Sequence, residues 1–420
     1  MNRYSHLYLV GVVLLGVVKS EVIFEAVKLD WVWDNPGMKD QYIASGDYDP
    51  QFCHISGVQY DGFSGDVFVT VPRLKAAKGV PAGLNIISPN NLLEPFPNFE
   101  ANKLGDCKAL QLPMSVAVDP RKNLLYVIDV GRVGVTTDHP SNLCPPKLVV
   151  YTTLRGDMVR SHELPDSVVP HTSSFLNDLV LDYVDPEQTE GAKYVYISDT
   201  IGEQLIVFDL TSNETWSYKH NSMRFDNDSN INIIGVNYSW PYGINGIAMS
   251  PSFNYVYYSA LGSKKLWQIP TWVLRKNDSD FSSYVRYVGD KVSNSDAMVF
   301  GKRSLYYGAL SKDAVYKWNA EKDLIDQGVT EGEVRAVTQV PIIQNWETIQ
   351  WPDGIALGSR YSDENRLYFV SARAQLFHSN ALDFSGAHGA NFRVFKVAVD
   401  EESYLAESDK DKLPIAVVVG

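Results

Sequence analysis

The sequence predicts an all-β protein, a six-bladed β-propeller closed by an N-terminal strand. Two observations carry this prediction: a strand-pair pattern returns six times, and an alternating stretch precedes its first copy. Each copy opens with small or polar residues, continues through a short apolar strand and a turn, and ends in a strand rich in Tyr and Val. The copies align on Gly57, Ser115, Asp178, Gly246, Asp296 and Gly354. Intervals of about 50 to 70 residues with several strands each indicate propeller blades.

A further apolar strand follows each copy, which gives every unit at least three strands. These strands read GLNIIS, KLVVYTT, EQLIVFDL, KKLWQIP, DAVYKWN and FRVFKVAV. A single small sheet cannot bury both of its faces, so the units are expected to stack around a central channel. Two stacked β-sandwich domains are the structural alternative, but no Pro, Gly or Ser-rich linker occurs near the middle of the chain.

The two chain ends are expected to have different roles. Residues 1–20 combine Arg3, an apolar run over residues 7–18 and the small residues Val18 and Ser20, the pattern of a signal peptide cleaved after Ser20. The run is too short to span a bilayer comfortably. Residues 22–33 alternate like a strand and are expected to pair with the last blade. The propeller is assigned to residues 21–400 and a C-terminal tail to residues 401–420.

Composition bounds the partners and the compartment. The net charge of −13 disfavours nucleic acid and anionic membranes, and most of it is interpreted as serving solubility. A signal peptide implies a secreted, extracellular protein without a membrane anchor. Sequons begin at Asn213, Asn227, Asn237 and Asn277, which are possible glycosylation sites in the secretory pathway. The oligomeric state is not indicated.

Polar residues open the repeats, and in a propeller the innermost strands start beside the axial channel. The positions are Ser56, Met114, Asn177, Asp178, Asn245, Ser295, Asp296 and Asp353. Converging carboxylates and amides could hold an amine or a hard cation. The alternative is that these residues only cap turns and satisfy backbone groups at strand ends.

Two kinds of chemistry receive limited support. The segment NGIAMSP over residues 245–251 resembles regucalcin-like lactonases, in which Asn177, Asn245, Asp296 and Asp353 would imitate a calcium site. The matching glutamate near the first repeat is missing, so no metal or other cofactor is assigned and calcium stays an alternative. No nucleophile elbow, dinucleotide fingerprint or P-loop occurs, and the eight histidines are scattered, with His54 and His378 near inner-strand segments.

Several longer strings resemble the yellow / major royal jelly protein family. They include residues 70–87 (TVPRLKAAKGVPAGLNII), 196–210 (YISDTIGEQLIVFDL), 235–251 (GVNYSWPYGINGIAMSP) and 305–319 (LYYGALSKDAVYKWN). The resemblance runs in order from about residue 55 to residue 397. It implies a secreted protein of cuticle, haemolymph or a gland secretion, linked to melanin and catecholamine metabolism. Some relatives convert dopachrome, others bind biogenic amines in the axial pocket, and others are nutritional.

The resemblance also suggests residue roles. Amine-binding relatives use a hydroxyl residue, an Asn and a Phe where this chain has Pro352, Ala372 and Ala374, so a different pocket is expected. Asp353, Arg373 and Gln375 could shape that pocket. For a catecholic ligand a carboxylate would pair with the ammonium, and Trp351 or Phe377 would stack on the ring; both aromatics could instead only pack between blades.

The cysteines follow from the same resemblance. Cys107 and Cys144 match the family's paired cysteines, and a bridge between them would add about 3 kcal/mol of stability in the chain-entropy model. Cys53 would remain free and buried.

Three function classes follow: a melanin-pathway protein that binds or isomerises a catechol-derived molecule such as dopachrome, a non-enzymatic carrier or structural protein, and a calcium-dependent lactonase-like hydrolase.

Overall fold

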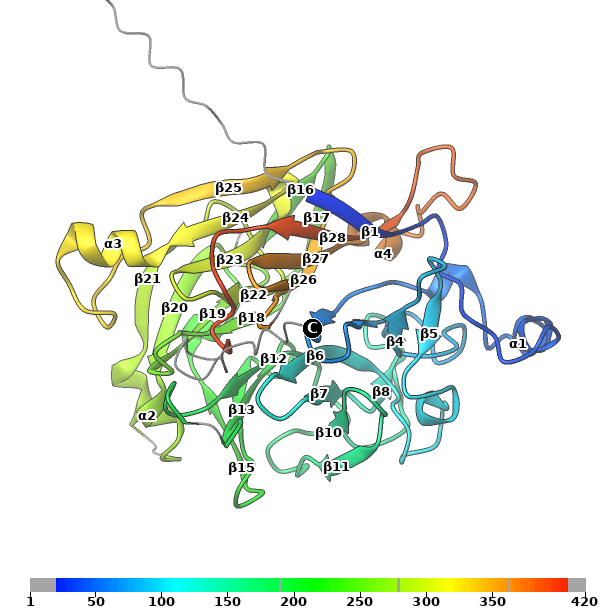
Figure 1. Cartoon of the computed structure of the whole chain (residues 1–420), viewed down its shortest axis with the longest axis horizontal. Coiled ribbons are helices and arrows are strands. Elements are labelled where there is room, and N and C mark those ends of the chain that lie inside the picture. Colours follow the sequence, from blue (N-terminus) through cyan, green and yellow to red (C-terminus); the bar gives the residue numbers. More distant parts are fainter. Residues whose placement is uncertain (1–19, 189, 228, 278–279, 361–362, 407–420) are drawn as a thin grey trace, which may run out of the picture.

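Six four-stranded antiparallel sheets surround a central axis, as the repeat pattern predicts (Figure 1). The computed structural model describes residues 20–188, 190–227, 229–277, 280–360 and 363–406. Neighbouring innermost strands contact one another around the ring, including the last with the first. This ring excludes the alternative of two stacked sandwiches. The predicted signal peptide, apart from Ser20, and residues 407–420 lie outside the described residues.

Every sheet runs from the axis outwards. The innermost strands are β2 (Val58–Tyr60), β6 (Pro113–Asp119), β12 (Leu176–Asp182), β18 (Ile244–Met249), β22 (Met298–Phe300) and β26 (Pro352–Leu357). The second strands are β3 (Val67–Thr70), β7 (Leu124–Asp129), β13 (Tyr194–Asp199), β19 (Tyr255–Ala260), β23 (Ser304–Ala309) and β27 (Arg366–Ser371). The third strands are β4 (Leu84–Ile87), β10 (Lys147–Thr152), β14 (Gln204–Asp209), β20 (Lys265–Pro270), β24 (Ala314–Asn319) and β28 (Phe392–Ala398). The outer strands are β5 (Leu93–Pro95), β11 (Met158–Glu163), β15 (Thr215–Lys219), β21 (Arg286–Asp290), β25 (Gln339–Gln344) and β1 (Ser20–Ala26).

The remaining elements connect the blades. Two extra hairpins pair β8 (Arg132–Val133) with β9 (Ser141–Asn142), and β16 (Asn230–Ile233) with β17 (Val236–Ser239). The α-helices of the described residues are α1 (Met38–Ser45), α2 (Thr271–Leu274), α3 (Ala320–Gln327) and α4 (Ala374–His378). None of these helices is long and apolar enough to cross a membrane.

The N-terminal strand closes the ring, as predicted. β1 pairs antiparallel with β28, from Ser20 opposite Val397 to Ala26 opposite Phe392. The strand is shorter than the alternating pattern over residues 22–33 indicates, because the chain then crosses to the first blade. There Trp31 bridges to Leu93 of β5, and its indole donates to Asn85 Oδ1 at 2.8 Å. The N-terminal segment therefore joins the last blade to the first.

Two repeat glycines are explained by the close approach of neighbouring innermost strands. A Cβ atom at Gly246 would lie 2.2 Å from the carbonyl oxygen of Asp296, and one at Gly354 would lie 2.4 Å from that of Ser56. The Gly354 amide also donates to the Ser56 carbonyl at 3.0 Å. Any side chain at either position would force the blades apart at the axis. These glycines allow the polar residues beside them to reach the channel.

The last described residues pack against the ring. After β28 the chain turns toward the axis (red in Figure 1), where Glu401 Oε1 accepts from the Tyr306 hydroxyl at 2.6 Å. Tyr404 is 5% exposed, and its hydroxyl accepts from the Leu181 amide at 3.1 Å. Ser403 and Tyr404 line a cavity at this end of the channel. Residues 401–406 of the segment assigned to a tail thus cover one end of the channel.

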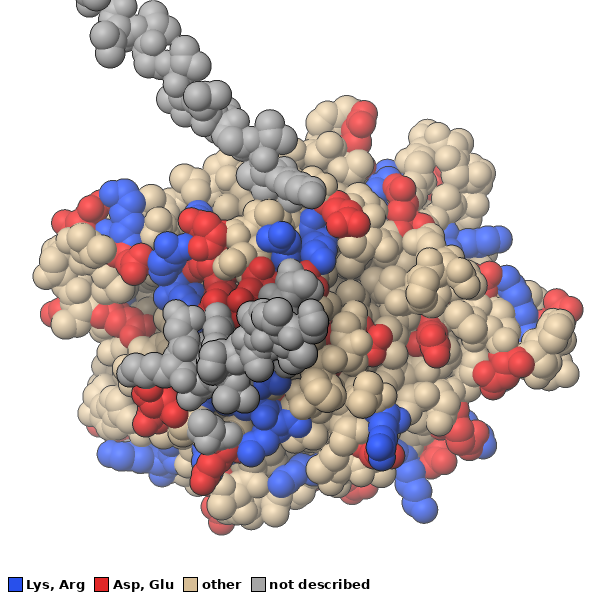
Figure 2. Space-filling view, in the orientation of Figure 1, with Lys and Arg blue, Asp and Glu red and all other residues tan. Residues whose placement is uncertain are grey.

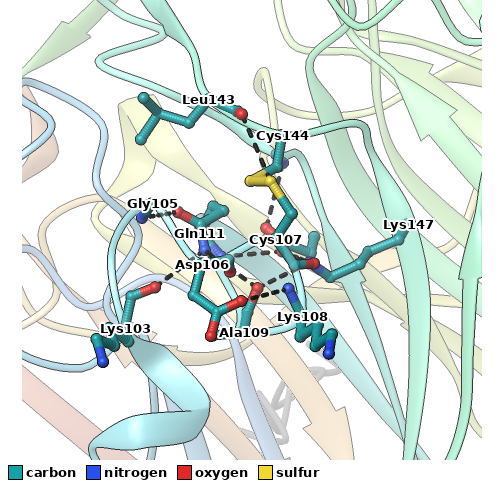
Figure 3. Close-up of a disulfide and its surroundings, with 12 residues drawn as sticks. Lys103, Gly105, Asp106, Cys107, Lys108, Ala109, Gln111, Leu143, Cys144 and Lys147 are labelled. Carbon is teal, nitrogen blue, oxygen red and sulfur yellow. Dashed lines mark hydrogen bonds and ion pairs between the residues drawn. A yellow bond between two sulfur atoms is a disulfide. The ribbon is translucent and has the colours of Figure 1, made fainter.

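The disulfide expected from the resemblance is confirmed. Cys107 and Cys144 are bonded, with their Cα atoms 5.3 Å apart (Figure 3). Beside them Lys147 donates to the carbonyl of Cys107 at 2.8 Å and forms a buried ion pair with Asp129 at 3.1 Å. Cys53 is free and buried. The bridge ties the loop before β6 to the loop before β10 within the second blade.

The distribution of charged side chains on the surface agrees with the interpretation that most of the net charge serves solubility. Acidic and basic side chains are interspersed over the face in Figure 2, without one sign dominating it. The asparagines of the four sequons, at positions 213, 227, 237 and 277, are all exposed. Each is therefore accessible for the predicted glycosylation.

Candidate functional site

The innermost strands begin around a small cavity at one end of the channel, which we call the mouth cavity. All six blades contribute to it. The lining residues are His54, Ser56, Leu74, Met114, Thr136, Phe175, Asn177, Trp240, Tyr242, Asn245, Leu261, Asp296, Trp351, Asp353, Ala374 and His378. Its free space is about 30 Å³, which is room for about two water molecules.

The structure brings five of the nine candidate ligand-binding residues together here. Asn177, Asn245, Asp296, Trp351 and Asp353 all line the mouth cavity. The innermost strands all run in the same direction along the channel. Polar residues at equivalent strand starts therefore converge at the same end of it.

Asp178 follows Asn177 in strand β12 but does not line the mouth cavity. Successive side chains of a strand alternate in direction, and Asp178 lines the cavity at the opposite end of the channel. Its carboxylate accepts from Ser115 Oγ at 3.1 Å and from the Ile247 amide at 3.2 Å.

The three remaining candidates come from α4 and the residue before it, and none of them lines the mouth cavity. Side chains four apart share a helix face, and on α4 Ala374 and His378 face the mouth cavity. Arg373 and Gln375 instead line a separate groove. Phe377 lies behind the mouth, with its ring 4.7 Å from that of His54.

Three buried aspartates give the channel an unusual electrostatic character. Burial raises the pKa of Asp178 to about 7. Burial also raises the pKa of Asp296 to about 6, although hydrogen bonds from Trp351 and Asn245 act in the opposite direction. Burial, followed by the charges of Asp296 and Asp178, raises the pKa of Asp353 well above its usual range. Buried like charges resist ionising together. Asp353 therefore retains its proton near neutral pH, whereas Asp296, with a pKa of about 6, ionises first.

A hydrogen-bonded chain connects His54 to one of these carboxyls. His54 Nδ1 lies 3.2 Å from Ser56 Oγ, and Ser56 in turn bonds to Asp353. The other ring nitrogen, Nε2, is buried and has no partner among the described residues, and the same holds for Asn245 Oδ1. Burial lowers the pKa of His54 to about 3, so its imidazole is neutral. Two unsatisfied polar atoms beside one cavity indicate a place for a polar ligand.

An aromatic cluster covers the cavity. The ring of Trp240, just after the β16–β17 hairpin, lies 4.4 Å from that of His378 and 5.2 Å from that of Trp351. The hairpin is anchored by Ile231 and Ile233, which pack against Trp351 and Ala374. A ligand larger than water can reach the cavity only if this cover moves.

Trp351 occupies a strained position in this cover. Its φ of +52° is uncommon for a bulky residue, and such strain gathers at functional sites. The indole Nε1 donates to Asp296 Oδ2 at 2.8 Å. This hydrogen bond holds the indole ring of Trp351 beside the carboxyl group of Asp296.

The residues named for the calcium alternative meet at this cavity. Asn177, Asn245, Asp296 and Asp353 all line it, so two carboxylates and two amides converge. Among the residues that the structure describes, no group of three or more His, Cys, Asp or Glu side chains is placed to hold a metal ion.

Comparison with known proteins places the chain in a family. The family model described as Major royal jelly protein matches residues 113–404, from the second blade to Tyr404. The chain belongs to the major royal jelly protein family. The resemblance seen in the sequence is thereby confirmed.

Two relatives within the family are 25–28% identical to this chain. Protein yellow of Drosophila melanogaster is 28% identical over 88% of this chain, which spans 66% of that relative's length. Major royal jelly protein 1 of Apis mellifera is 25% identical over the full length of both chains. Among solved structures, a luciferin-regenerating enzyme is 11% identical, with a TM-score of 0.49 over 93% of this chain and 100% of the other.

Several lining residues of this royal jelly family member were not selected from the sequence. The sequence indicates only that His54 and His378 lie near inner-strand segments, and that Trp240 and Tyr242 lie in a family-like string. His54 comes from the loop before β2, and the two aromatics follow a hairpin outside the repeat. The sequence feature that could have identified His54, Trp240 and Tyr242 is that each lies shortly before the start of an innermost strand.

Proposed function

We propose that this protein is a secreted member of the melanin and catecholamine pathway that binds a catechol-derived molecule such as dopachrome at the mouth cavity and isomerises it. The observation that carries the proposal is the neutral His54, with Nε2 unpartnered, in one cavity with Asp353, a carboxyl whose pKa burial raises well above its usual range. The likeness to Protein yellow and the motifs of the chain support the pathway.

The proposed chemistry is a proton transfer without any oxidant or reductant. Isomerising a quinone-like ring removes a proton from carbon and delivers one to oxygen, so atoms and electrons balance. His54 Nε2 would accept the first proton, and the Asp353 carboxyl would donate the second. An anionic ligand beside His54 would raise the pKa of the imidazole from its value in the dry cavity toward neutrality.

Ligand access requires the aromatic cover to open. A free space of about 30 Å³ is far smaller than a bicyclic ligand, so Trp240 and the β16–β17 hairpin would swing outwards. When the cover closes again, aromatic faces of Trp240 and Tyr242 would lie against the ligand and exclude water from the proton transfer.

The experiment is the decay of dopachrome absorbance with purified, glycosylated protein. The wild type should accelerate the decay in proportion to its concentration, and Asp353→Asn should lose that acceleration. Asp313→Asn is the matched control, because burial also raises the pKa of Asp313 to about 6 but this residue is outside the channel. No acceleration by the wild type, or equal rates for wild type and Asp353→Asn, would overturn the proposal.

One observation favours a non-enzymatic carrier as the second candidate. The mouth cavity has a free space of only about 30 Å³ and is lined by Ala374, where amine-binding relatives are expected to have a larger residue. A narrow pocket suits retention more than turnover. Under this alternative, dopamine or serotonin would bind by titration calorimetry without any acceleration of dopachrome decay.

A further inference from the structure

A second cavity lies outside the channel, on the far side of the β16–β17 hairpin. It is a groove of about 480 Å³ between this hairpin, the loop before β26, α4 and the loop before β28. We call it the outer groove. Its size is within the range of small-molecule sites, and it is more than ten times as spacious as the mouth cavity.

Two guanidinium groups lie along one wall of the outer groove. Arg373 and Arg393 line it and are 7% and 6% exposed. Arg393 Nε is paired with Glu25 Oε1 at 2.8 Å, whereas Arg373 contacts only neutral oxygens, the His388 carbonyl at 3.0 Å and Asn391 Oδ1 at 3.3 Å. Burial and the charge of Arg393 both lower the pKa of Arg373. An anion between the two groups would relieve this repulsion.

Two buried polar atoms at the groove have no partner among the described residues. They are Nε of Arg373 and Oε1 of Gln375. The Gln375 amide nitrogen is already used, because it donates to Gln350 Oε1 at 2.9 Å. Buried polar atoms are normally satisfied. A ligand that satisfies both atoms needs a hydrogen-bond acceptor for Arg373 Nε and a hydrogen-bond donor for Gln375 Oε1.

Much of the remaining lining is apolar and open to solvent, with the exposed Glu347 and the half-buried Thr348 beside it. Trp346 is 61% exposed and Ile234 is 42% exposed, and both line the groove together with Val236 and Leu376. A large exposed indole beside exposed aliphatic side chains is typical of a surface that receives a ring. The groove thus combines an anion subsite, a hydrogen-bond acceptor and a face for stacking.

We infer that the outer groove is a second binding site, which takes a small aromatic carboxylate with a hydroxyl on its ring. The carboxylate pairs with Arg373 and Arg393, the ring lies on Trp346, and the hydroxyl donates to Gln375 Oε1. The site is separate from the mouth cavity and does not depend on the activity proposed there.

The test is titration calorimetry of the intact protein with 4-hydroxyphenylacetate. Tyramine is the matched probe, since it keeps the phenol and replaces the carboxylate with an ammonium group. The wild type should bind the carboxylate saturably and tyramine at least tenfold more weakly. Trp346→Ala and Arg373→Gln should each weaken binding of the carboxylate at least tenfold.

Matched variants make the test specific. Trp272→Ala removes another exposed indole, and Arg286→Gln removes another arginine with an unpartnered Nε; both should bind as the wild type does. Asp353→Asn, in the mouth cavity, should also bind normally. Absence of saturable binding, equal binding of tyramine, or binding that Asp353→Asn abolishes while Trp346→Ala and Arg373→Gln retain it would overturn the inference. Since Trp346 is exposed, Trp346→Ala keeps the test valid even if Arg373→Gln fails to fold.

Discussion

The imidazole Nδ1 of His54 lies 3.2 Å from Oγ of Ser56 at the mouth of the channel. Ser56 also bonds to Asp353, and a hydroxyl has only one proton to donate. If that proton is directed to Asp353, Ser56 accepts from Nδ1–H and the lone pair of His54 is on Nε2. This nitrogen is the buried atom without a partner. In that tautomer His54 is able to accept a proton from a ligand.

Asp178→Asn should change the pH dependence of stability. The folded pKa of Asp178 is raised to about 7, from a usual value of about 4. The unfolded chain releases this proton first, so the wild type loses stability as pH rises from about 4 to about 7. The variant has no such loss, and its free energy of unfolding relative to wild type should rise by about 3 kcal/mol across this window.

Urea denaturation at a series of pH values measures this difference. Asp383→Asn is the control: hydrogen bonds from Ser385 and His388 lower the pKa of Asp383, so its removal should produce no rise between pH 4 and 7. A difference for Asp178→Asn that is constant over this window would contradict the account of the channel carboxyls.

Tyr404→Ala should destabilise the protein by about 3 kcal/mol, because it removes a buried aromatic side chain and leaves a cavity. It also removes the acceptor of the Leu181 amide. Tyr284→Ala, at a side chain that is 41% exposed, should change stability little. Thermal or urea unfolding compares the two variants, and equal stabilities would show that residues 401–406 do not pack on the channel.

Alkylation followed by intact-mass measurement should separate the three cysteines. The native protein should take up no label, because Cys53 is buried and the other two cysteines are bonded. The unfolded but unreduced protein should take up one label, and the unfolded, reduced protein should take up three. Replacing both Cys107 and Cys144 with Ser should lower stability by about 3–4 kcal/mol in the chain-entropy model. Three labels without reduction would rule out the bridge.

Calcium should leave the melting temperature unchanged. A ligand that binds the folded state raises stability, but the mouth cavity is lined by two carboxyls, and burial raises the pKa of one of them, Asp353, well above its usual range. Differential scanning fluorimetry with calcium and with a chelator measures this directly. A clear rise with calcium and a fall with chelator would instead support the lactonase-like alternative.

The repeat pattern was sufficient to predict the ring and much of the mouth. Asn245, Asp296 and Asp353 occupy equivalent strand starts, so they converge once the blades close into a circle. The pairing of the N-terminal strand with the last blade was predictable from its alternation and from the need to close the ring, although the residue at which β1 ends was not. That depends on Trp31 meeting Leu93 in another blade, which is a contact between segments far apart in the chain.

The remainder of the site depends on features outside the repeat. Arg373 was expected near the mouth, but a φ of +46° precedes α4, and the helix then directs Ala374 and His378 to the channel and Gln375 to the outer groove. Trp240 reaches the mouth because a hairpin inserted between blades folds back over it. Neither a left-handed residue nor the direction of an inserted hairpin follows from hydrophobic periodicity.

The central claim is tested most directly by the rate of dopachrome loss with His54→Gln beside the wild type. His162→Gln is the matched control, since burial also lowers the pKa of His162 but this residue is on the outer strand β11. With all three proteins melting at similar temperatures, the account predicts acceleration by the wild type and His162→Gln and a rate for His54→Gln at least a hundredfold lower. A His54→Gln protein as fast as the wild type would contradict proton transfer at the channel mouth.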